Sequence, residues 1–266
     1  MSTPSNKSGA LYLVPTPLDF GMAQDNLAPL GEWLPAETLR VASRLSHWIT
    51  ENAKSTRAFL KRVEAVSGLA APVQAQHIAE LPRAAHKKGD HAPQAGNDAD
   101  ARALLAPALQ GHDLGLVSEA GMPAIADPGS SVVRAAHAMG LRVVPLTGPI
   151  SLTLALAASG LNGQNFAFVG YVPQEATERA KRLRELEALA LKTGQTQLFI
   201  ETPYRNTALL QALMQTLHPH TRLAVCGALT LPQQVCRSGL ISEWKRDKRL
   251  QDGLPLDAPS VFLLGR

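Results

Sequence analysis

The segment of residues 114–146 constrains the fold most, because it carries the signals of a strand, a loop, a helix and a second strand in that order. Leu114–Val117 is a short apolar run, typical of a strand buried in a parallel sheet. Asp127 precedes a proline, and we expect its carboxylate to cap a helix that begins there and ends at Gly140. Residues 141–146 predict the next strand. Such a unit indicates an α/β fold.

The loop between this first strand and the helix is a candidate ligand-binding loop. It combines one carboxylate with glycine and proline, in the order Glu119, Ala120, Gly121, Met122 and Pro123. In open parallel sheets, ligands bind outside the carboxyl ends of the strands, where this loop would lie. An ordinary tight connection fits the loop chemistry equally well.

The first half of the chain alternates between strand and helix signals. We expect strands at residues 11–14 and 47–50, each followed by a helix, at residues 35–45 and 55–66. This alternation favours a parallel sheet. Residues 67–100 show little periodicity, and we expect a flexible surface loop there.

A hinge at Thr147-Gly148-Pro149 separates an N-terminal domain of residues 1–147 from a C-terminal domain of residues 148–266. In the second domain we expect helices at 151–159, 175–191 and 207–217, strands at 166–170, 197–200, 222–226 and 260–264, and a turn-rich section before the last strand. In the long helix, Leu183, Leu186 and Leu189 are expected to face the core.

The composition is that of a globular protein. The chain has 266 residues, of which 45% are hydrophobic and 18% charged, so disorder of the whole chain is excluded. The net charge of +4 is compatible with an anionic partner, but the basic residues form no long block. Arg179, Lys181, Arg182 and Arg184 fit the solvent face of a helix better than a dedicated nucleic-acid surface.

Neither a metal site nor a membrane span is expected. Cys226 and Cys236 are too few for a disulfide framework and lack zinc-ligand spacing, which fits a reducing cytoplasm. His77, His86 and His91 are irregularly spaced, and we interpret them as solvated loop residues. The sequence has no apolar stretch of roughly 18 residues and no secretory segment, so we expect a cytoplasmic protein.

Six segments together carry a resemblance to a known family. In order they are LYLVPTP, VSEAGMPAIADPG, RVVPLTGPISL, FAFVGYVP followed by ERAKRL, ETPYR, and PSVFLLGR. Outside residues 67–113 the chain resembles the tetrapyrrole methylase family, and most of all its branch of ribosomal RNA methyltransferases, which methylate a ribose 2′-hydroxyl. The resemblance implies two α/β domains, the first with a parallel sheet covered by helices on both faces and the second with a mixed sheet. It also implies a homodimer, with S-adenosyl-L-methionine bound in a cleft between the domains.

The resemblance further implies which residues line the cofactor pocket. Besides the loop from Glu119 to Pro123, these are residues that follow strand ends or the hinge: Pro17, Ser151, Leu152, Glu201, Thr202, Leu229 and Pro259. Carboxylates and carbonyl oxygens stabilise a sulfonium cation, whereas adenine requires an apolar slot with backbone hydrogen bonds. Turn formation is the alternative role for the hydroxyl residues and the glycine. For Glu119 we favour ligand binding, because a carboxylate in a crevice otherwise lacks a partner.

Two segments depart from the pattern of the branch. Where the ribosomal RNA enzymes have AEDTR, this chain has Thr50-Glu51-Asn52-Ala53-Lys54, and the ELTK-like segment reads Ala228-Leu229-Thr230-Leu231. Glu51 is a candidate general base for a hydroxyl acceptor, and Lys54 a candidate contact to a phosphate or an oxyanion. A carboxylate at a helix start and a solvated lysine explain these two residues equally well.

Three functions remain open from the sequence. The first is an S-adenosyl-L-methionine-dependent methyltransferase that acts on RNA of the small ribosomal subunit. The second is a methyltransferase of the same class that acts on a tetrapyrrole or another small molecule. The third is a non-catalytic RNA-binding protein that has kept the fold. Binding of the cofactor separates the third from the first two, and RNA-dependent methylation separates the first from the second.

Overall fold

The computed structural model describes residues 8–19, 28–82 and 98–266. The chain forms two compact units, Met1–Pro149 and Ile150–Arg266. The division falls at the end of the Thr147-Gly148-Pro149 segment, whereas the sequence placed it between residues 147 and 148.

The first unit contains a parallel sheet in the order β3-β2-β4-β1-β5. Its strands are β1 (Ala10–Leu13), β2 (His47–Thr50), β3 (His77–Glu80), β4 (Leu114–Val117) and β5 (Arg142–Pro145). Because all the strands run in one direction, their carboxyl ends lie along the same edge of the sheet. The loops after β1, β2 and β4 are therefore neighbours.

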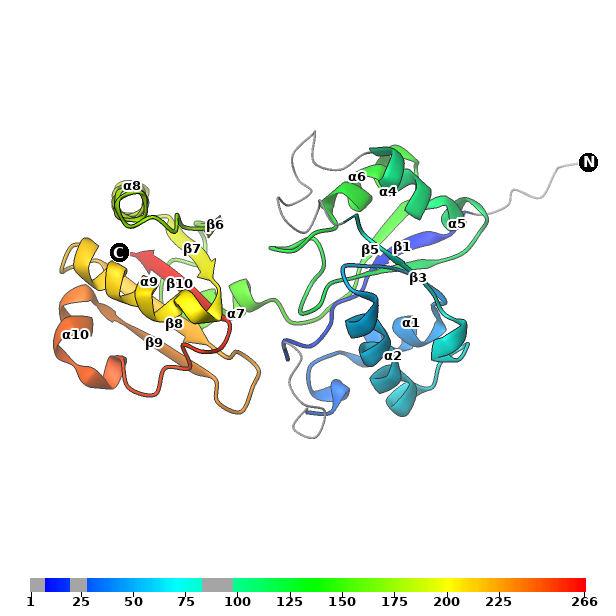
Figure 1. The fold of residues 1–266 in the computed structure, drawn as a ribbon, viewed down its shortest axis with the longest axis horizontal. Helices are drawn as coiled ribbons and strands as arrows, with labels where there is room; N and C mark the ends of the chain where they lie inside the picture. The colour runs from blue at the N-terminus through cyan, green and yellow to red at the C-terminus, as the bar shows by residue number, and fades with distance from the viewer. Residues whose placement is uncertain (1–7, 20–27, 83–97) are drawn as a thin grey trace, which may run out of the picture. The chain divides into compact units, whose positions relative to one another are not determined.

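Helices cover both faces of this sheet, as predicted (Figure 1). One face packs against α1 (Ala36–Arg44), α2 (Ala53–Ser67), η2 (Leu30–Glu32) and η3 (Val73–Ala75), and the other against α4 (Asp98–Leu104), α5 (Ala106–Leu109) and α6 (Ser130–Ala138). Trp48 and Ile49 are neighbours on β2 but belong to different core clusters, since successive strand residues point to opposite faces.

Two predictions about the first unit are wrong. Residues 67–100 are not one flexible loop, because β3 lies within them and pairs with β2, and α4 begins at Asp98. Strand β3 is a short edge strand of mostly exposed residues, so it lacks the apolar alternation that a sequence pattern can detect. His77 accordingly lies on a strand rather than in a loop, whereas His86 and His91 lie outside the described residues.

The helix predicted to begin at Asp127 begins instead at Ser130, and its N-cap is Gly129, without a side-chain cap. Gly129 adopts a φ of 133°, a left-handed conformation that favours glycine and separates Asp127 from the helix. Asp127 is therefore not the N-cap residue of α6.

The second unit contains a mixed sheet, as the family resemblance implied, and its strand order is β6-β7-β10-β8-β9. Its strands are β6 (Phe166–Tyr171), β7 (Thr196–Glu201), β8 (Arg222–Gly227), β9 (Val235–Leu240) and β10 (Ser260–Gly265). Strands β6 and β7 are parallel, and the other neighbours are antiparallel. Strand β9 and helix α10 (Ile241–Arg246) occupy the section that was predicted to be turns, which is a correction.

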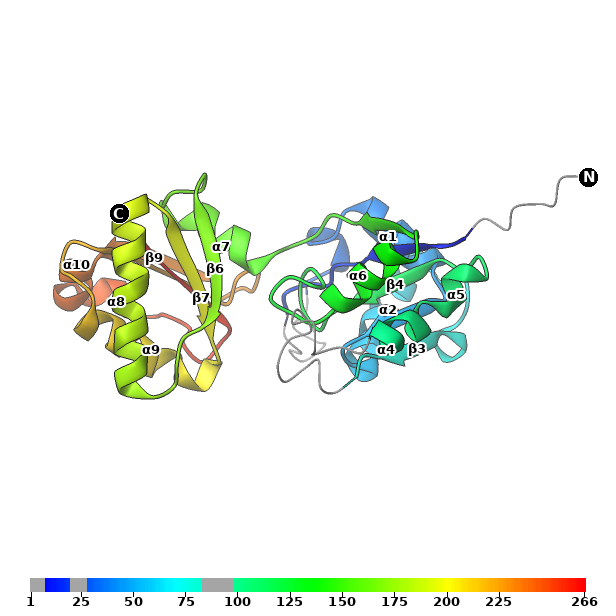
Figure 2. The same ribbon diagram turned by 90° about the horizontal axis from the view of Figure 1, so that it is seen from above.

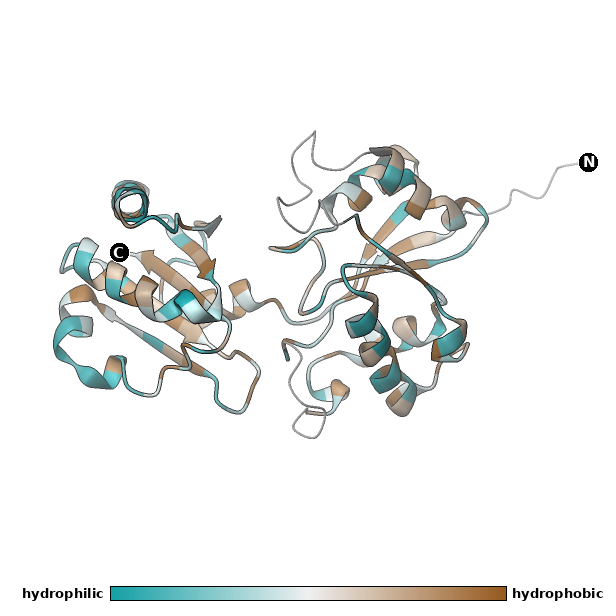
Figure 3. Ribbon diagram, viewed as in Figure 1, coloured by the Kyte–Doolittle hydropathy of each residue, from teal (hydrophilic) through white to brown (hydrophobic). Residues whose placement is uncertain are grey.

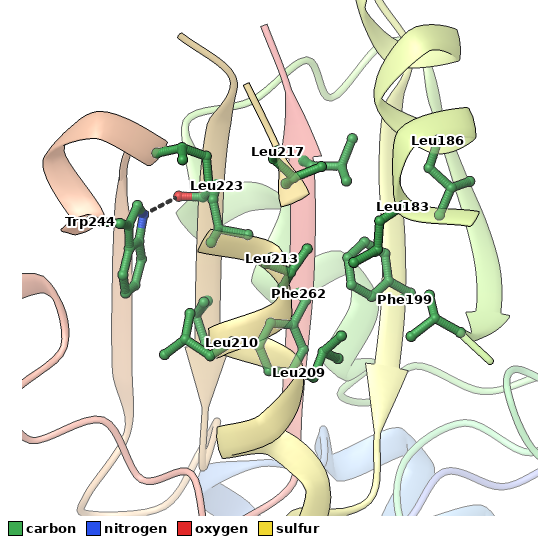
Figure 4. Packing of buried hydrophobic residues seen from close by; sticks show 14 of the residues in the cluster. Leu183, Leu186, Phe199, Leu209, Leu210, Leu213, Leu217, Leu223, Trp244 and Phe262 are labelled. Carbon is green, nitrogen blue, oxygen red and sulfur yellow. Dashed lines mark hydrogen bonds between the residues drawn. The ribbon is translucent and has the colours of Figure 1, made fainter. Parts of the chain in front are cut away.

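In Figure 2 this sheet lies between α7 (Ser151–Ser159) on one side and α8 (Ala176–Thr193) and α9 (Pro203–Thr216) on the other. The larger core cluster joins α8, α9 and α10 to the sheet, with Phe199 and Phe262 stacked at 6.0 Å (Figure 4). Trp244 donates its indole N–H to the carbonyl of Leu223 at 2.9 Å, so the buried N–H group has a hydrogen-bond acceptor.

Helix α8 packs through Leu183, Leu186 and Ala190, which lie on one face of a helix at spacings of three and four residues. The prediction that Leu189 faces the core is wrong, because this residue is 42% exposed.

Figure 3 shows the division between core and surface, with apolar colour concentrated on the strands and polar colour on the helices. Within the described residues no helix is both long and apolar enough to cross a membrane.

Candidate functional site

The loops that follow β1 and β4 are hydrogen-bonded to one another. Thr16 and Gly121 exchange two backbone hydrogen bonds, at 3.0 and 3.1 Å, and the Thr16 hydroxyl donates to the carbonyl of Ser118 at 3.3 Å. Pro17 follows Thr16 directly and is buried. The structure therefore brings together two of the predicted cofactor residues, Pro17 and Gly121, from segments about a hundred residues apart in the chain.

Gly121 occupies a position that requires glycine. Its φ is 82°, and a Cβ atom there would lie 3.0 Å from a side-chain carbon of Leu18. Two alanines further along the loop, Ala124 and Ala126, also have positive φ values, of 64° and 63°. Non-glycine residues in this region are strained, and such strain concentrates at ligand-binding loops. The loop after β4 therefore has a constrained backbone at Gly121, Ala124 and Ala126, and the assignment of residues 119–123 to cofactor binding stays a prediction.

Asn52 joins the loop after β2 to the loop after β4. Its side-chain oxygen caps α2 by accepting from the backbone N–H groups of Lys54 and Ser55, at 2.9 and 3.4 Å. Its amide nitrogen donates to Glu119 at 2.7 Å. An aspartate can cap the helix but cannot donate to Glu119, so the asparagine that departs from the AEDTR pattern performs both tasks.

Three carboxylates gather at the carboxyl ends of β2 and β4. Burial of the Asp127 carboxyl, together with the nearby charge of Glu51, raises the pKa of Asp127 to about 7, and Glu119 adds a smaller effect in the same direction. The Ser118 hydroxyl lies beside Asp127 and partly opposes this rise, although it makes no hydrogen bond of good geometry to any residue that the structure describes. We call Glu51, Glu119 and Asp127 the carboxylate cluster.

The two predicted catalytic residues lie at different depths. Glu51 is half-buried beside Asp127 and belongs to the carboxylate cluster. Lys54 is exposed in the first turn of α2, and its backbone N–H binds Asn52. Of the remaining loop residues, Ala120 and Met122 are half-buried, and Pro123 is buried.

In the second unit, four of the predicted residues lie along one edge of the sheet. Glu201 ends β7, opposite Ser260 at the start of β10, and Ser260 is in turn opposite Gly227 at the end of β8. Pro259 precedes β10 and accepts a backbone hydrogen bond from Ala228 at 3.0 Å. This arrangement places Thr202 and Leu229, which follow β7 and β8, at the same edge.

Ser151 and Leu152 open helix α7, and the buried Leu152 belongs to the same core cluster as Leu229. Leu229 lies between Ala228 and Thr230, which have positive φ values of 51° and 69°. The segment that departs from the ELTK-like pattern is thus strained in the same way as the loop after β4.

The Glu201 carboxylate is engaged by its own neighbours. It accepts hydrogen bonds from Arg205 at 2.7 Å, from the backbone N–H of Thr202 at 2.7 Å and from the Thr202 hydroxyl at 3.2 Å. The Glu201 side chain is 4% exposed, and the guanidinium of Arg205 also lies over the ring of Tyr204 at 5.0 Å. The Glu201 charge is therefore compensated within the loop.

Three residues at these loops were not assigned to the candidate site from the sequence. Asp127 was interpreted as a helix cap, and Asn52 and Arg205 were not assigned a role in binding. The signal for Asn52 was its place in a motif that otherwise carries aspartate. An asparagine there replaces a group that only accepts hydrogen bonds with one that also donates them.

The described residues contain no group of three or more histidines, cysteines or carboxylates that could hold a metal ion.

Comparison with known proteins decides the family. The tetrapyrrole (corrin/porphyrin) methylases match residues 48–244. The chain belongs to this family. It is 31% identical over 232 residues to the ribosomal RNA small subunit methyltransferase I of Mesorhizobium japonicum, which covers 87% of this chain and 67% of that protein. The protein of the same name from Bacillus subtilis is 30% identical over 246 residues, covering 91% and 72%. The chain is a methyltransferase.

Two solved structures show the same fold. The methyltransferase CobJ aligns with 97% of this chain and 95% of its own length, at 19% identity and a TM-score of 0.53. The uroporphyrin-III-C-methyltransferase of Thermus thermophilus aligns with 97% and 94%, at 19% identity and a TM-score of 0.50. At this identity the likeness concerns the α/β architecture alone.

Proposed function

We propose that this chain transfers a methyl group from S-adenosyl-L-methionine to a ribose 2′-hydroxyl of small-subunit ribosomal RNA. The observation that carries the proposal is the similarity, over 87% of this chain, to a protein named ribosomal RNA small subunit methyltransferase I. The same name recurs for the similar Bacillus subtilis protein. The geometry of the carboxylate cluster then suggests how the chain performs the reaction.

The carboxylate cluster suits a cationic methyl donor. Glu119 accepts its hydrogen bond from the neutral amide of Asn52, so this partner leaves the negative charge of Glu119 in place. When bound, S-adenosyl-L-methionine supplies a methyl group on a positively charged sulfur, which nearby carboxylates stabilise. The buried Ser118 hydroxyl beside Asp127 makes no hydrogen bond of good geometry to a described residue, and it offers a further polar contact.

A ribose hydroxyl must lose its proton as the new bond forms. Glu51 is the base that the sequence suggests, and Asp127 beside it has a pKa raised to about 7. A carboxyl group with a pKa near the working pH is a more effective base than one with an ordinary pKa. We assign proton removal to the Glu51 and Asp127 pair, and we assign to the exposed Lys54 a contact with an RNA phosphate.

The proposal includes a homodimer that acts in the cytoplasm, as the family resemblance implies. The net charge of +4 supports an anionic partner such as ribosomal RNA. Light scattering coupled to gel filtration gives the mass of the particle and decides between a monomer and a dimer.

The test is transfer of tritium from methyl-labelled S-adenosyl-L-methionine to small ribosomal subunits isolated from cells that lack this protein. We expect label in the RNA, and nucleoside mass spectrometry should identify a ribose-methylated nucleoside. Subunits from cells that contain the protein are the control and should accept little label. Label in a small molecule without RNA would indicate the tetrapyrrole-type alternative. If calorimetry showed no cofactor binding, the chain would be a non-catalytic relative.

A further inference from the structure

The two cysteines of the chain face each other across β8 and β9. Cys226 and Cys236 are directly opposite in this antiparallel pair, and both are free thiols. Opposite residues in such a pair have Cα atoms about 4.5 or 5.5 Å apart, and their side chains point to the same face. A disulfide spans Cα distances of about 4.4–6.8 Å, so the register permits a bond in either pairing class.

The two thiols have different surroundings on that face. Cys226 is fully buried among the side chains that α7 covers, and its thiol donates to the carbonyl of Ala155 at 3.7 Å. Cys236 is only partly buried against the same cluster. Burial and the contact with Cys236 raise the pKa of the Cys226 thiol, which keeps it protonated. Cys236 is therefore the thiol that a small reagent reaches first.

The pair closes the base of a hairpin loop. Residues 228–234 connect β8 to β9, and Gly227 and Val235 form the last strand pair before the loop, next to the cysteines. This loop contains Ala228 and Thr230, the two non-glycine residues of the second unit with positive φ. A covalent bond between the cysteines would restrain a loop whose backbone is already strained.

We propose that Cys226 and Cys236 are a redox modification site, at which a peroxide converts the two thiols into a disulfide that a dithiol reduces again. The Cys236 thiol gives up its proton, its sulfur attacks one peroxide oxygen, and the O–O bond breaks. The sulfur becomes a sulfenic acid, and the departing hydroxide takes up the released proton to form one water. The Cys226 sulfur then attacks the sulfenic sulfur, its proton leaves with the hydroxyl as a second water, and the S–S bond forms. Two thiols are oxidised, and one peroxide is reduced to water.

The difference in burial sets the order of attack. The partly buried Cys236 reacts with the peroxide, and the buried Cys226 then closes the disulfide. Neither cysteine belongs to the carboxylate cluster, so this inference does not depend on the proposed methyl transfer.

The test uses the full chain in its native state. The protein is treated with hydrogen peroxide, the remaining thiols are blocked with a maleimide, and the digested peptides are examined by mass spectrometry. We expect one linked pair of peptides that contain Cys226 and Cys236, lighter by two hydrogen atoms than the separate peptides and separated again by dithiothreitol. Hydrogen exchange in residues 228–234 should slow on oxidation.

Single variants separate the steps. Cys226→Ser should accumulate a sulfenic acid on Cys236 that dimedone traps, whereas Cys236→Ser should leave the buried Cys226 unreacted under the same conditions. Circular dichroism checks that each variant is folded. If a variant does not fold, the linked peptides of the wild-type protein still test the proposal. Oxidation of Cys236 to a sulfinic acid without a linked pair, or links only between two chains, would overturn the proposal.

Discussion

Glu119 and Glu201 each stand within two residues of the end of a buried strand, yet their carboxylates have opposite surroundings. Glu119 accepts from a neutral amide and adds its charge to that of neighbouring carboxylates. Glu201 accepts from the Arg205 guanidinium and from Thr202 within its own loop. The difference shows that an acidic residue at a strand end can either present charge to a ligand or use its charge to hold the loop.

Glu119→Gln should have the largest effect on cofactor binding. Glu119→Gln keeps a carbonyl oxygen that can accept from Asn52 but removes the charge. We expect affinity for S-adenosyl-L-methionine to fall on the order of 10- to 100-fold, because losing an interaction with a charged group costs about 1.5–3 kcal/mol. Titration calorimetry measures the change.

Glu201→Gln is the matched variant in the second unit. It should leave the affinity within about threefold of wild type, since this charge is already compensated by Arg205, and it should lower the melting temperature instead. Equal losses of affinity in the two variants would show that both carboxylates present charge to the ligand.

Asp127 gives a pH-dependent effect. Its pKa is raised to about 7 in the folded protein, so the folded state holds a proton that the unfolded chain has lost. Stability should therefore fall as the pH rises from about 4 to about 7. Asp127→Asn should remove this slope and stabilise the protein by on the order of 1–2 kcal/mol near pH 8. Denaturant unfolding at several pH values measures it, and an unchanged slope would contradict the assignment.

Asn52→Asp tests how much the hydrogen bond from Asn52 to Glu119 contributes to stability. The new carboxylate still caps α2 but lies against Glu119, so we expect a loss of about 1 kcal/mol at neutral pH that disappears as acid protonates the pair. Asn52→Ser is the control, because serine also caps a helix and adds no charge. If the aspartate variant were as stable as wild type at every pH, the hydrogen bond to Glu119 would contribute nothing to the free energy of unfolding.

The smallest effect on stability is expected at the amino ends of the strands of the first sheet. There His47 stacks between His77 and His112, at ring-centroid distances of 4.6 and 4.4 Å. Burial and the charges of His112 and His77 lower the pKa of His47, so its contribution to stability is present above about pH 6.5 and is lost as the pH falls below that value. His112→Ala should raise the pKa of His47, because it removes the nearby charge of His112, and NMR titration measures the change. A fall in that pKa would contradict the stacking account.

Much of the fold follows from local patterns in the sequence. The parallel first sheet was predictable, because strand and helix signals alternate and β4 is a short apolar run, whereas the mixed second sheet was implied by the family resemblance. Strand β3 was missed because three of its four residues are exposed at a sheet edge. Leu189 was misplaced because the buried stripe of α8 continues through Ala190, a shift of one position that apolar residues alone do not specify.

The loops of the candidate site were predictable, but the partners of their side chains were not. Glu119 stands out in the sequence, whereas its contact with Asn52 joins residues 67 positions apart. Likewise, the proximity of Asp127 to Glu51 depends on how two loops close over one sheet edge, which no local pattern encodes.

If the carboxylate cluster recognises a cationic methyl donor, it must distinguish two ligands that differ in charge at sulfur. S-adenosyl-L-methionine carries a sulfonium, and S-adenosylhomocysteine carries a neutral thioether. We measure the ratio of their dissociation constants by calorimetry in wild type and in Glu119→Gln. The account predicts that the variant weakens the sulfonium ligand far more than the thioether, so that the ratio shifts several-fold toward the thioether. An unchanged ratio, with both ligands weakened equally, would contradict it.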